Sequence, residues 1–286
     1  MGRVKSRCRP LVFGVRALIV LSLAARAGAQ VDTIRPTRSL FTWRDGVLAG
    51  VFVLGTIAIR PLDKSAALSL QDSSRQKNRT LQRMATVVRN IALPGSTIIG
   101  PSMYAIGRLT KEDRLAQLGL HGTEALVLGA GIGSVLKDVF GRARPFVDTI
   151  SPNPDDFQLL RGFKRGNDFR SFPSGHSLAA FAAAAAVSAE TSRWWSWASY
   201  TIGPAMYGGA AAVGVSRMYN NRHWASDVIL GAALGTFAGT KVVRYHATHP
   251  GNRIDKWLIN ASFSPSNPGQ LSLSILPVIG RSLPRR

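Results

Sequence analysis

The chain has 286 residues and a formal net charge of +21, from 36 Lys and Arg against 15 Asp and Glu. Its length suits one sizeable domain, and its mean hydropathy of +0.07 is low for a chain that lies mostly in a membrane. The single cysteine excludes a disulfide framework and a thiolate metal site. The basic residues are spread over nearly every polar segment without interleaved aromatics. This pattern argues against nucleic acid and favours an anionic membrane surface or an anionic substrate as the partner.

The first 29 residues have the features of a secretory signal peptide. A basic start precedes an apolar run over residues 17–25, and Ala27-Gly28-Ala29 predicts cleavage before Gln30. The apolar run is shorter than the ~20 residues that a membrane span needs, so a cleaved signal is favoured over an uncleaved anchor. The signal predicts secretion across the inner membrane into the cell envelope.

The middle of the chain predicts an all-α helical bundle. After a short N-terminal arm at residues 30–45, a helical domain is expected over residues 46–245, with its motif core at residues 115–245. Two helices are expected in a basic connecting segment, at residues 65–70 and 79–88. Six apolar segments form the predicted core: residues 46–59, 91–108, 115–140, 176–190, 194–215 and 224–243.

A long loop and a C-terminal tail complete the chain. Residues 141–170 are rich in Pro, Asp, Asn and Gly, and a loop of that length inside a compact helical domain is more often functional than idle. Within the tail, residues 246–286, two loosely alternating segments at 258–263 and 271–278 flank a turn-like stretch. They predict a short β-hairpin-like tail, to which the sequence assigns no function.

The lengths of the predicted helices are compatible with either a membrane protein or a soluble periplasmic protein. Residues 115–136 and 194–216 are long enough to cross a bilayer, whereas residues 46–59 and 177–190 are short for a hydrocarbon core of about 30 Å and suit buried or tilted helices. We expect an envelope protein that is embedded in or associated with the membrane. A soluble periplasmic protein is the alternative.

Three polar clusters interrupt the helices, and the last of them contains His223 and Asp227. These two residues are four apart at the start of a helix and therefore share one face. A carboxylate there can bond one ring nitrogen and leave the lone pair of the other free to attack, as in a hydrolase triad. An isolated pair of this kind is more often a helix-start histidine beside an exposed aspartate.

The middle cluster, Pro173-Ser174-Gly175-His176, opens an alanine-rich helix. Ser174 can cap this helix, Gly175 lets the backbone approach a ligand closely, and the unpaired N–H groups of the helix N-terminus favour an anion. His176 would lie at the mouth of the site, where it could protonate a leaving oxygen. The plain alternative is an ordinary N-cap.

The first cluster, residues 137–145, supplies positive charge. Lys137 offers a point charge and Arg144 a planar fork, both suited to phosphate oxygens, and Arg217 offers a second fork. Each could also be a solvated cation at a helix end. Three further arginines adjoin the clusters and are expected to add positive field without catalytic roles: Arg142, Arg170 and Arg222.

The remaining histidines receive plainer interpretations. His121 is expected to be a packed or buried polar residue in the middle of a helix, and His246 and His249 to be exposed near the tail. Beyond the three clusters, no group of His, Asp and Glu has metal-ligand spacing in the sequence.

Taken together, the three clusters resemble a known signature. Their order, spacing and residue identities are similar to the three-part motif of the type 2 phosphatidic acid phosphatase and vanadium haloperoxidase superfamily: Lys137-(six residues)-Arg144-Pro145, then Pro173-Ser174-Gly175-His176, then Ser216-Arg217-(five residues)-His223-(three residues)-Asp227. The resemblance directly covers residues 137–227 and implies the helical bundle of that superfamily.

The resemblance also implies a role for each motif residue. His223 would be the nucleophile that forms a phosphohistidine, Asp227 would orient it, and His176 would be the general acid. Three fixed cations would take the place of a metal, so neither a metal nor another cofactor is expected. The phosphoryl oxygens would be bound by these cations and by the start of the helix: Lys137, Arg144, Arg217, Ser174 and Gly175.

The predicted activity is hydrolysis of a phosphomonoester or diphosphate, on a lipid such as phosphatidic acid or a polyprenyl diphosphate, at a site that faces the periplasm or the outside. Two alternatives share the fold. One is a vanadate-dependent haloperoxidase, whose family members are usually much longer, and the other is a non-specific periplasmic acid phosphatase. A basic binding protein with incidental clusters is the non-enzymatic alternative, and scattered charge is its only support.

Overall fold

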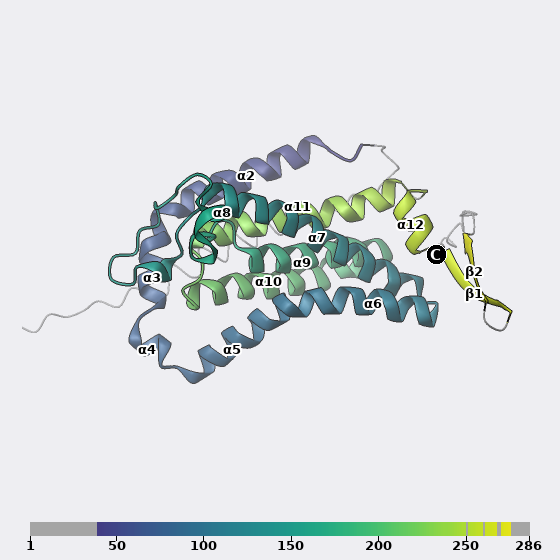
Figure 1. Ribbon diagram of the computed structural model, residues 1–286, viewed down its shortest axis with the longest axis horizontal. Helices are drawn as coiled ribbons and strands as arrows, with labels where there is room; N and C mark the ends of the chain where they lie inside the picture. Colours follow the sequence, from purple (N-terminus) through teal and green to yellow (C-terminus); the bar gives the residue numbers. More distant parts are fainter. Residues whose placement is uncertain (1–38, 250, 260, 268–269, 276–286) are drawn as a thin grey trace, which may run out of the picture.

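The structure is a computed structural model that describes residues 39–249, 251–259, 261–267 and 270–275. The predicted signal peptide lies outside this part of the chain, as does most of the predicted arm. The division into signal, arm, helical domain and tail therefore stays a prediction. The described residues form an elongated helical bundle with a small hairpin at one end (Figure 1).

Six long helices in the described ranges confirm the all-α prediction and match the six predicted segments. They are α2 (Trp43–Ile59), α6 (Ser96–Thr110), α7 (Asp113–Phe140), α9 (Gly175–Trp194), α10 (Ile202–Tyr219) and α11 (Ala225–Thr248). The helix predicted from residue 91 is interrupted at Pro94, because the residue before a proline avoids helical angles and Leu93 is extended.

Shorter elements connect the long helices. The two predicted in the basic segment are confirmed as α3 (Asp63–Leu70) and α5 (Arg79–Asn90). The remaining short elements are η1 (Arg60–Leu62), α4 (Ser73–Gln76), η2 (Ile91–Gly95), η3 (Pro145–Val147), α8 (Arg161–Arg165), η4 (Asn167–Phe169), η5 (Ser196–Ser199) and α12 (Arg253–Leu258).

Helix α9 forms the centre of the bundle and packs against α7, α10 and α11. Alanines at positions 182–186 and glycines of α11 keep the side chains between α9 and α11 small. A Cβ at Gly235 of α11 would lie 2.2 Å from the carbonyl oxygen of Leu178, so only glycine fits there. Because Gly231, Gly235 and Gly239 recur every four residues, they share the face of α11 that meets α9.

Helix α2 lies along α11 but buries little of itself. Phe52 is its one buried residue, so of the two predicted states, a buried or a tilted helix at residues 46–59, the buried one is wrong and the tilted one stays a prediction. Among the described residues, two stretches are long and apolar enough to cross a membrane, Trp43–Leu70 and Ala225–Thr248. The second is mostly buried in the bundle, whereas the first is almost entirely exposed. The apolar character of α11 is therefore explained by the core, and that of α2 is not.

The C-terminal segment contains a hairpin, as predicted, and a helix that was not predicted. Strands β1 (Ala261–Asn267) and β2 (Gln270–Ile275) pair antiparallel, with Ala261 opposite Ile275. Between α11 and β1, the six-residue helix α12 packs near the end of α11 (Figure 1). This end of the bundle is opposite the end that carries α8 and the long loop.

Candidate active site

The three sequence clusters meet at one end of the bundle. The helices α7 and α10 end there, and α9 and α11 begin there, because successive core helices run in opposite directions. A pocket of about 530 Å³ lies between these helix ends. Six of the eight predicted site residues line it: Lys137, Arg144, Gly175, His176, Arg217 and His223.

The other two predicted site residues, Ser174 and Asp227, lie behind the pocket wall and are fully buried. Ser174 is the N-cap of α9, as predicted, and its Oγ accepts hydrogen bonds from the backbone N–H and the hydroxyl of Ser177. Its own backbone N–H donates to the carbonyl of Asp227 at 2.9 Å. In this structure Ser174 joins the start of α9 to the start of α11, and its predicted contact with a phosphoryl group stays a prediction.

Positive charge dominates the pocket lining. Arg89 and Arg222 join the three predicted cations, and none of the residues that line the pocket is a carboxylate. Burial lowers the pKa of Arg144 and of Arg217 to about 10, and neighbouring arginines add to the effect. The pocket therefore holds five basic side chains close together, an arrangement that an anionic ligand would stabilise.

Lys137 is the cation whose protonation is most perturbed. Its Nζ donates to the carbonyl oxygens of Pro173 and Arg170, the latter at 3.2 Å. Burial lowers the pKa of Lys137 to about 7, and the charge of Arg144 contributes to this shift. A Cβ at Gly175 would lie 3.5 Å from Lys137 Cε, which places the lysine side chain against the start of α9.

Arg144 is held in place by the loop that follows α8. Its Nε and one terminal nitrogen donate to the main chain and side chain of Asn167, at 2.7 and 2.8 Å. The other terminal nitrogen donates to the carbonyl of Arg222 at 3.1 Å and lies 3.5 Å from His223 Nε2. Arg217 is also buried, and its Nε has no hydrogen-bond partner among the described residues.

The bonding of His223 defines which of its nitrogens could attack. Its Nδ1 lies 2.8 Å from the carbonyl oxygen of Ser171. Because a carbonyl only accepts, Nδ1 carries the proton, and the lone pair of Nε2 is on the side facing Arg144. Burial lowers the pKa of His223 to about 3, with Lys137 and Arg144 adding to the shift, so the ring is neutral near pH 7.

Asp227 does not accept the hydrogen bond that the sequence interpretation assigned to it. Its nearest oxygen lies 3.6 Å from His223 Nδ1, and the carbonyl of Ser171 takes that proton instead. The carboxylate accepts from Ser171 Oγ at 2.5 Å, from the Trp224 N–H at 2.9 Å and from Arg142 at 2.5 Å. Asp227 thus fixes the segment that orients His223 and places negative charge beside the ring.

His176 lines the pocket from the first turn of α9. Burial lowers its pKa to about 3, and Arg217 and Arg89 push it in the same direction. The ring is therefore neutral near pH 7 in the free pocket. A bound anion would oppose the effect of the arginines and raise this pKa.

Arg142 has a larger structural role than the sequence indicated. It is fully buried and bridges two buried aspartates, Asp63 at 2.7 Å and Asp227 at 2.5 Å. It also donates to Ser226 Oγ and to the carbonyl of Pro154. Sequence reasoning missed this hub because Asp63 lies in α3, far from every motif, and nothing local marks it as a partner.

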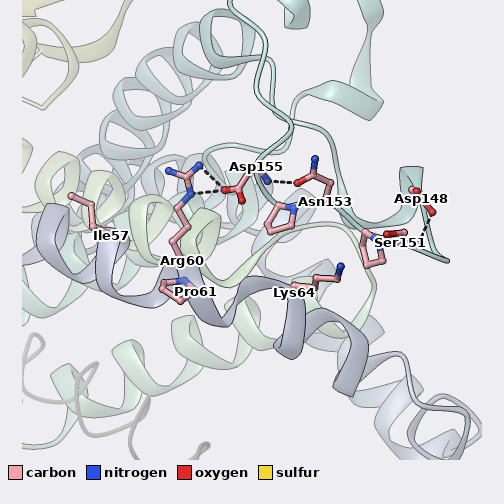
Figure 2. A pocket seen from close by; sticks show the side chains of 10 residues that line it. Ile57, Arg60, Pro61, Lys64, Asp148, Ser151, Asn153 and Asp155 are labelled. Carbon is pink, nitrogen blue, oxygen red and sulfur yellow. Dashed lines mark hydrogen bonds and ion pairs between the residues drawn. The ribbon is translucent and has the colours of Figure 1, made fainter.

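A second and larger pocket, of about 820 Å³, lies between the end of α2 and the long loop (Figure 2). Its residues include Lys64 and Asp148, and Arg60 donates to Asp155 at 2.7 and 3.0 Å across it. No predicted site residue and no histidine lines this pocket. The smaller pocket is therefore the candidate active site, because it contains the groups that can act as nucleophile and acid.

Comparisons with known proteins agree with this assignment of the motifs. Residues 120–250 match the model of the PAP2 superfamily. The chain is 46% identical over 141 residues to a lipid A 1-phosphatase of Porphyromonas gingivalis, covering 48% of this chain and 26% of that protein. It is 29% identical over 150 residues to an undecaprenyl-diphosphatase of Sulfolobus acidocaldarius, covering 51% of this chain and 63% of that protein.

The chain thus spans less than two thirds of the length of either relative. Among solved structures, Aquifex aeolicus LpxE aligns with a TM-score of 0.46 at 20% identity, over 64% of this chain and 96% of that one. The matched segment contains all three motifs, and residues of each motif line one pocket. Residues 120–250 of this chain are thus similar to the PAP2 superfamily.

Proposed function

We propose that this chain is a phosphatase that hydrolyses a lipid-linked phosphomonoester or diphosphate through a phosphohistidine at His223. The observation that carries the proposal is the composition of the smaller pocket, which combines five basic side chains with two neutral histidines and no carboxylate. Such a pocket binds a phosphoryl group by charge and offers it one nitrogen nucleophile and one proton carrier.

In the first step, His223 Nε2 attacks phosphorus. The Nε2–P bond forms as the P–O bond to the leaving group breaks, and His176 gives its proton to the leaving oxygen. The substrate's negative charge raises the pKa of His176 above its free value of about 3, so that the bound complex takes up this proton. Nδ1–H continues to donate to Ser171, and Asp227 stabilises the positive charge that develops on the ring.

In the second step, water attacks the phosphohistidine. The neutral His176 accepts a proton from the water as the new P–O bond forms and the Nε2–P bond breaks. As inorganic phosphate leaves, His176 releases the accepted proton to solvent, and both histidines are neutral again in the free pocket. Lys137, Arg144 and Arg217 stabilise the equatorial oxygens in both steps, since charge on these oxygens is greatest in the transition state.

Two observations support a lipid substrate. The names of both relatives describe phosphatases of lipid phosphates. In addition, α2 exposes large apolar side chains, including Trp43 (74%), Leu54 (66%) and Ile57 (62%), and further exposed apolar residues follow on α6 and α7. A soluble monomer rarely leaves such an extended apolar surface in water, so we propose that this surface contacts a membrane.

We further propose that the signal peptide directs the chain to the cell envelope, where the pocket faces the periplasm. N-terminal sequencing of the mature protein and fractionation of membranes test this location. A mature chain that begins at Gln30 and sediments with membranes is expected. An intact leader in the soluble cytoplasmic fraction would contradict the proposed location without affecting the proposed chemistry.

The activity is tested by phosphate release from the full chain in detergent micelles, with phosphatidic acid, a polyprenyl diphosphate and p-nitrophenyl phosphate as substrates. The variant His223→Ala should lose at least a thousandfold in kcat/KM, an order of magnitude typical of nucleophile removal. Lys164→Ala, which removes an exposed cation outside the pocket, should retain activity.

Two results would overturn parts of the proposal separately. Phosphate release that survives His223→Ala would refute the phosphohistidine at His223, and no release from any substrate by a protein that binds vanadate would refute the phosphatase. Equal kcat/KM for p-nitrophenyl phosphate and the lipids would refute the lipid preference alone. Acid-labile ³²P on the wild-type chain and none on His223→Ala would support the covalent intermediate.

A further inference from the structure

A second cluster of buried titratable residues lies at the end of the bundle opposite the candidate active site. His121 of α7 and His246 of α11 stack with ring centroids 3.9 Å apart, and both are almost fully buried. The predicted burial of His121 is confirmed, but the predicted exposure of His246 is wrong because Asp255 and Asn252 cover its ring. His121 is more than 100 residues from His246 and Asp255 in the sequence, so no spacing rule indicated the cluster.

His121 has one nitrogen engaged and one unengaged. Its Nδ1 lies 2.5 Å from Glu190 Oε1 of α9. Its Nε2 has no hydrogen-bond partner among the described residues, and Asp255 Oδ1 lies 3.9 Å from it. A carboxylate that holds one ring nitrogen and leaves the other directed into a polar cluster is the arrangement that orients histidine toward a metal.

His246 has the same arrangement from the other side. Its Nε2 lies 2.7 Å from Glu124 Oε2 of α7, and its Nδ1 lies 2.7 Å from Asp255 Oδ1 of α12. Asp255 Oδ1 therefore lies between the two rings, near Nδ1 of His246 and Nε2 of His121. The other oxygen of Glu124 is buried and has no hydrogen-bond partner among the described residues.

Three carboxylates meet in this cluster, those of Glu124, Glu190 and Asp255, and Arg193 offsets one of them with a contact of 3.1 Å to Glu190. A divalent cation held by the two imidazoles and Asp255 would offset the charge of the other two carboxylates.

We propose that His121 Nε2, His246 Nδ1 and Asp255 Oδ1 form a binding site for a divalent metal ion of the zinc type. These residues offer ligand atoms that all lie within 4.8 Å of one another. Ligands at about 2.0–2.2 Å around a tetrahedral Zn²⁺ are roughly 3.3–3.6 Å apart, so changes of about 1.5 Å or less complete the site. The metal separates Asp255 from His246 and opens the ring stack, and water takes the fourth position while Glu124 keeps its contact with His246 Nε2.

The metal would be structural. His176 and Glu190 lie at opposite ends of α9 and are about 21 Å apart at 1.5 Å per residue, so the metal is too far from the pocket to act on phosphate. It joins α12 to α7, α9 and α11, and therefore fixes the segment that leads into the hairpin. The proposal is independent of the function proposed for the pocket.

Zinc titration of the full chain tests the site. After dialysis against a chelator, calorimetry and elemental analysis should find one Zn²⁺ per chain, and the Tm should rise with zinc. Mg²⁺ at the same concentration should have no effect, since imidazole ligands favour zinc. Asp255→Asn should abolish binding, and Glu190→Gln should weaken it by about 10–100-fold through the orientation of His121. His249→Ala, which removes a nearby exposed histidine, should bind as wild type.

Absence of stoichiometric zinc binding by the wild-type chain would overturn the proposal. So would binding that is unchanged in both Asp255→Asn and His121→Ala, because the metal would then be held elsewhere. If a variant unfolds, zinc-dependent protection of the α12 amides in hydrogen exchange of the wild-type chain replaces it as the readout. No protection there would also count against the site.

Discussion

Above pH 7 the pocket should lose affinity for dianions, because Lys137 loses its proton there. Burial lowers the pKa of Lys137 to about 7 in the free pocket. A bound dianion needs the protonated lysine, so binding above this pH must be accompanied by proton uptake. The sign follows directly: affinity is full below pH 7 and falls as the pH rises through the free-pocket pKa.

The expected magnitude is about tenfold in Kd per pH unit, or about 1.4 kcal/mol, between pH 7.5 and 9. The other lining groups contribute little slope in this window. His176 and His223 have pKa values of about 3 in the free pocket, and those of Arg144 and Arg217 are about 10. Sulfate is a suitable probe because it remains a dianion throughout, and calorimetric titration gives its Kd at each pH.

Two variants give this prediction its control. Lys137→Met should bind sulfate more weakly at pH 7 and show a flat Kd between pH 7.5 and 9. Lys164→Met removes an exposed lysine outside the pocket and should keep the wild-type slope. A wild-type Kd that does not change over this window, or a slope that persists in Lys137→Met, would refute the assignment of the titrating group.

Three further predictions concern the surroundings of the site. Arg142→Met leaves Asp63 and Asp227 buried without their shared cation and should lower the free energy of unfolding by about 3–5 kcal/mol. Arg165→Met, at the exposed end of α8, should change it by less than about 0.5 kcal/mol, and equal denaturation midpoints for the two variants would contradict the role of Arg142. Gly235→Ala should destabilise the protein by about 1–3 kcal/mol, because its Cβ would lie 2.2 Å from Leu178 O. Its control is Gly131→Ala, which has open space around its Cβ and should be neutral or stabilising; thermal melts measure both variants. Ser171→Ala keeps the carbonyl that holds His223 and should lower kcat about tenfold or less, whereas Asp227→Asn should lower kcat more. Steady-state assays measure both variants. A larger loss of kcat in Ser171→Ala than in Asp227→Asn would mean that Asp227 has little influence on the His223 ring.

The helices and the site motifs could be predicted because their signals are local. Apolar periodicity marked each of the six long helices, and Pro173 to His176 could be placed at a helix start from four adjacent residues. The convergence of the three clusters followed from their order and spacing. These features depend on neighbours in sequence, which a sequence displays directly.

The features that were missed depend on contacts between distant segments. Arg89 reaches the pocket from α5, and Asp63 reaches Arg142 from α3, with no local pattern in either case. The acceptor of the His223 proton was misassigned because a backbone carbonyl leaves no mark in the sequence. The sequence left the surroundings of α2 open, as a buried or a tilted helix, because the length of an apolar segment does not say whether protein or another apolar phase covers it.

The close contact between α9 and α11 has a consequence for how the chain can vary. Since glycines of α11 lie against the backbone of α9, there are no flexible side chains between the two helices to absorb a change in volume. One helix carries His176 and the other carries Asp227. An added methyl anywhere along this seam would therefore displace the proton donor relative to the support of the nucleophile. Residue size should consequently be constrained for the whole length of the seam, including positions far from any bound phosphate.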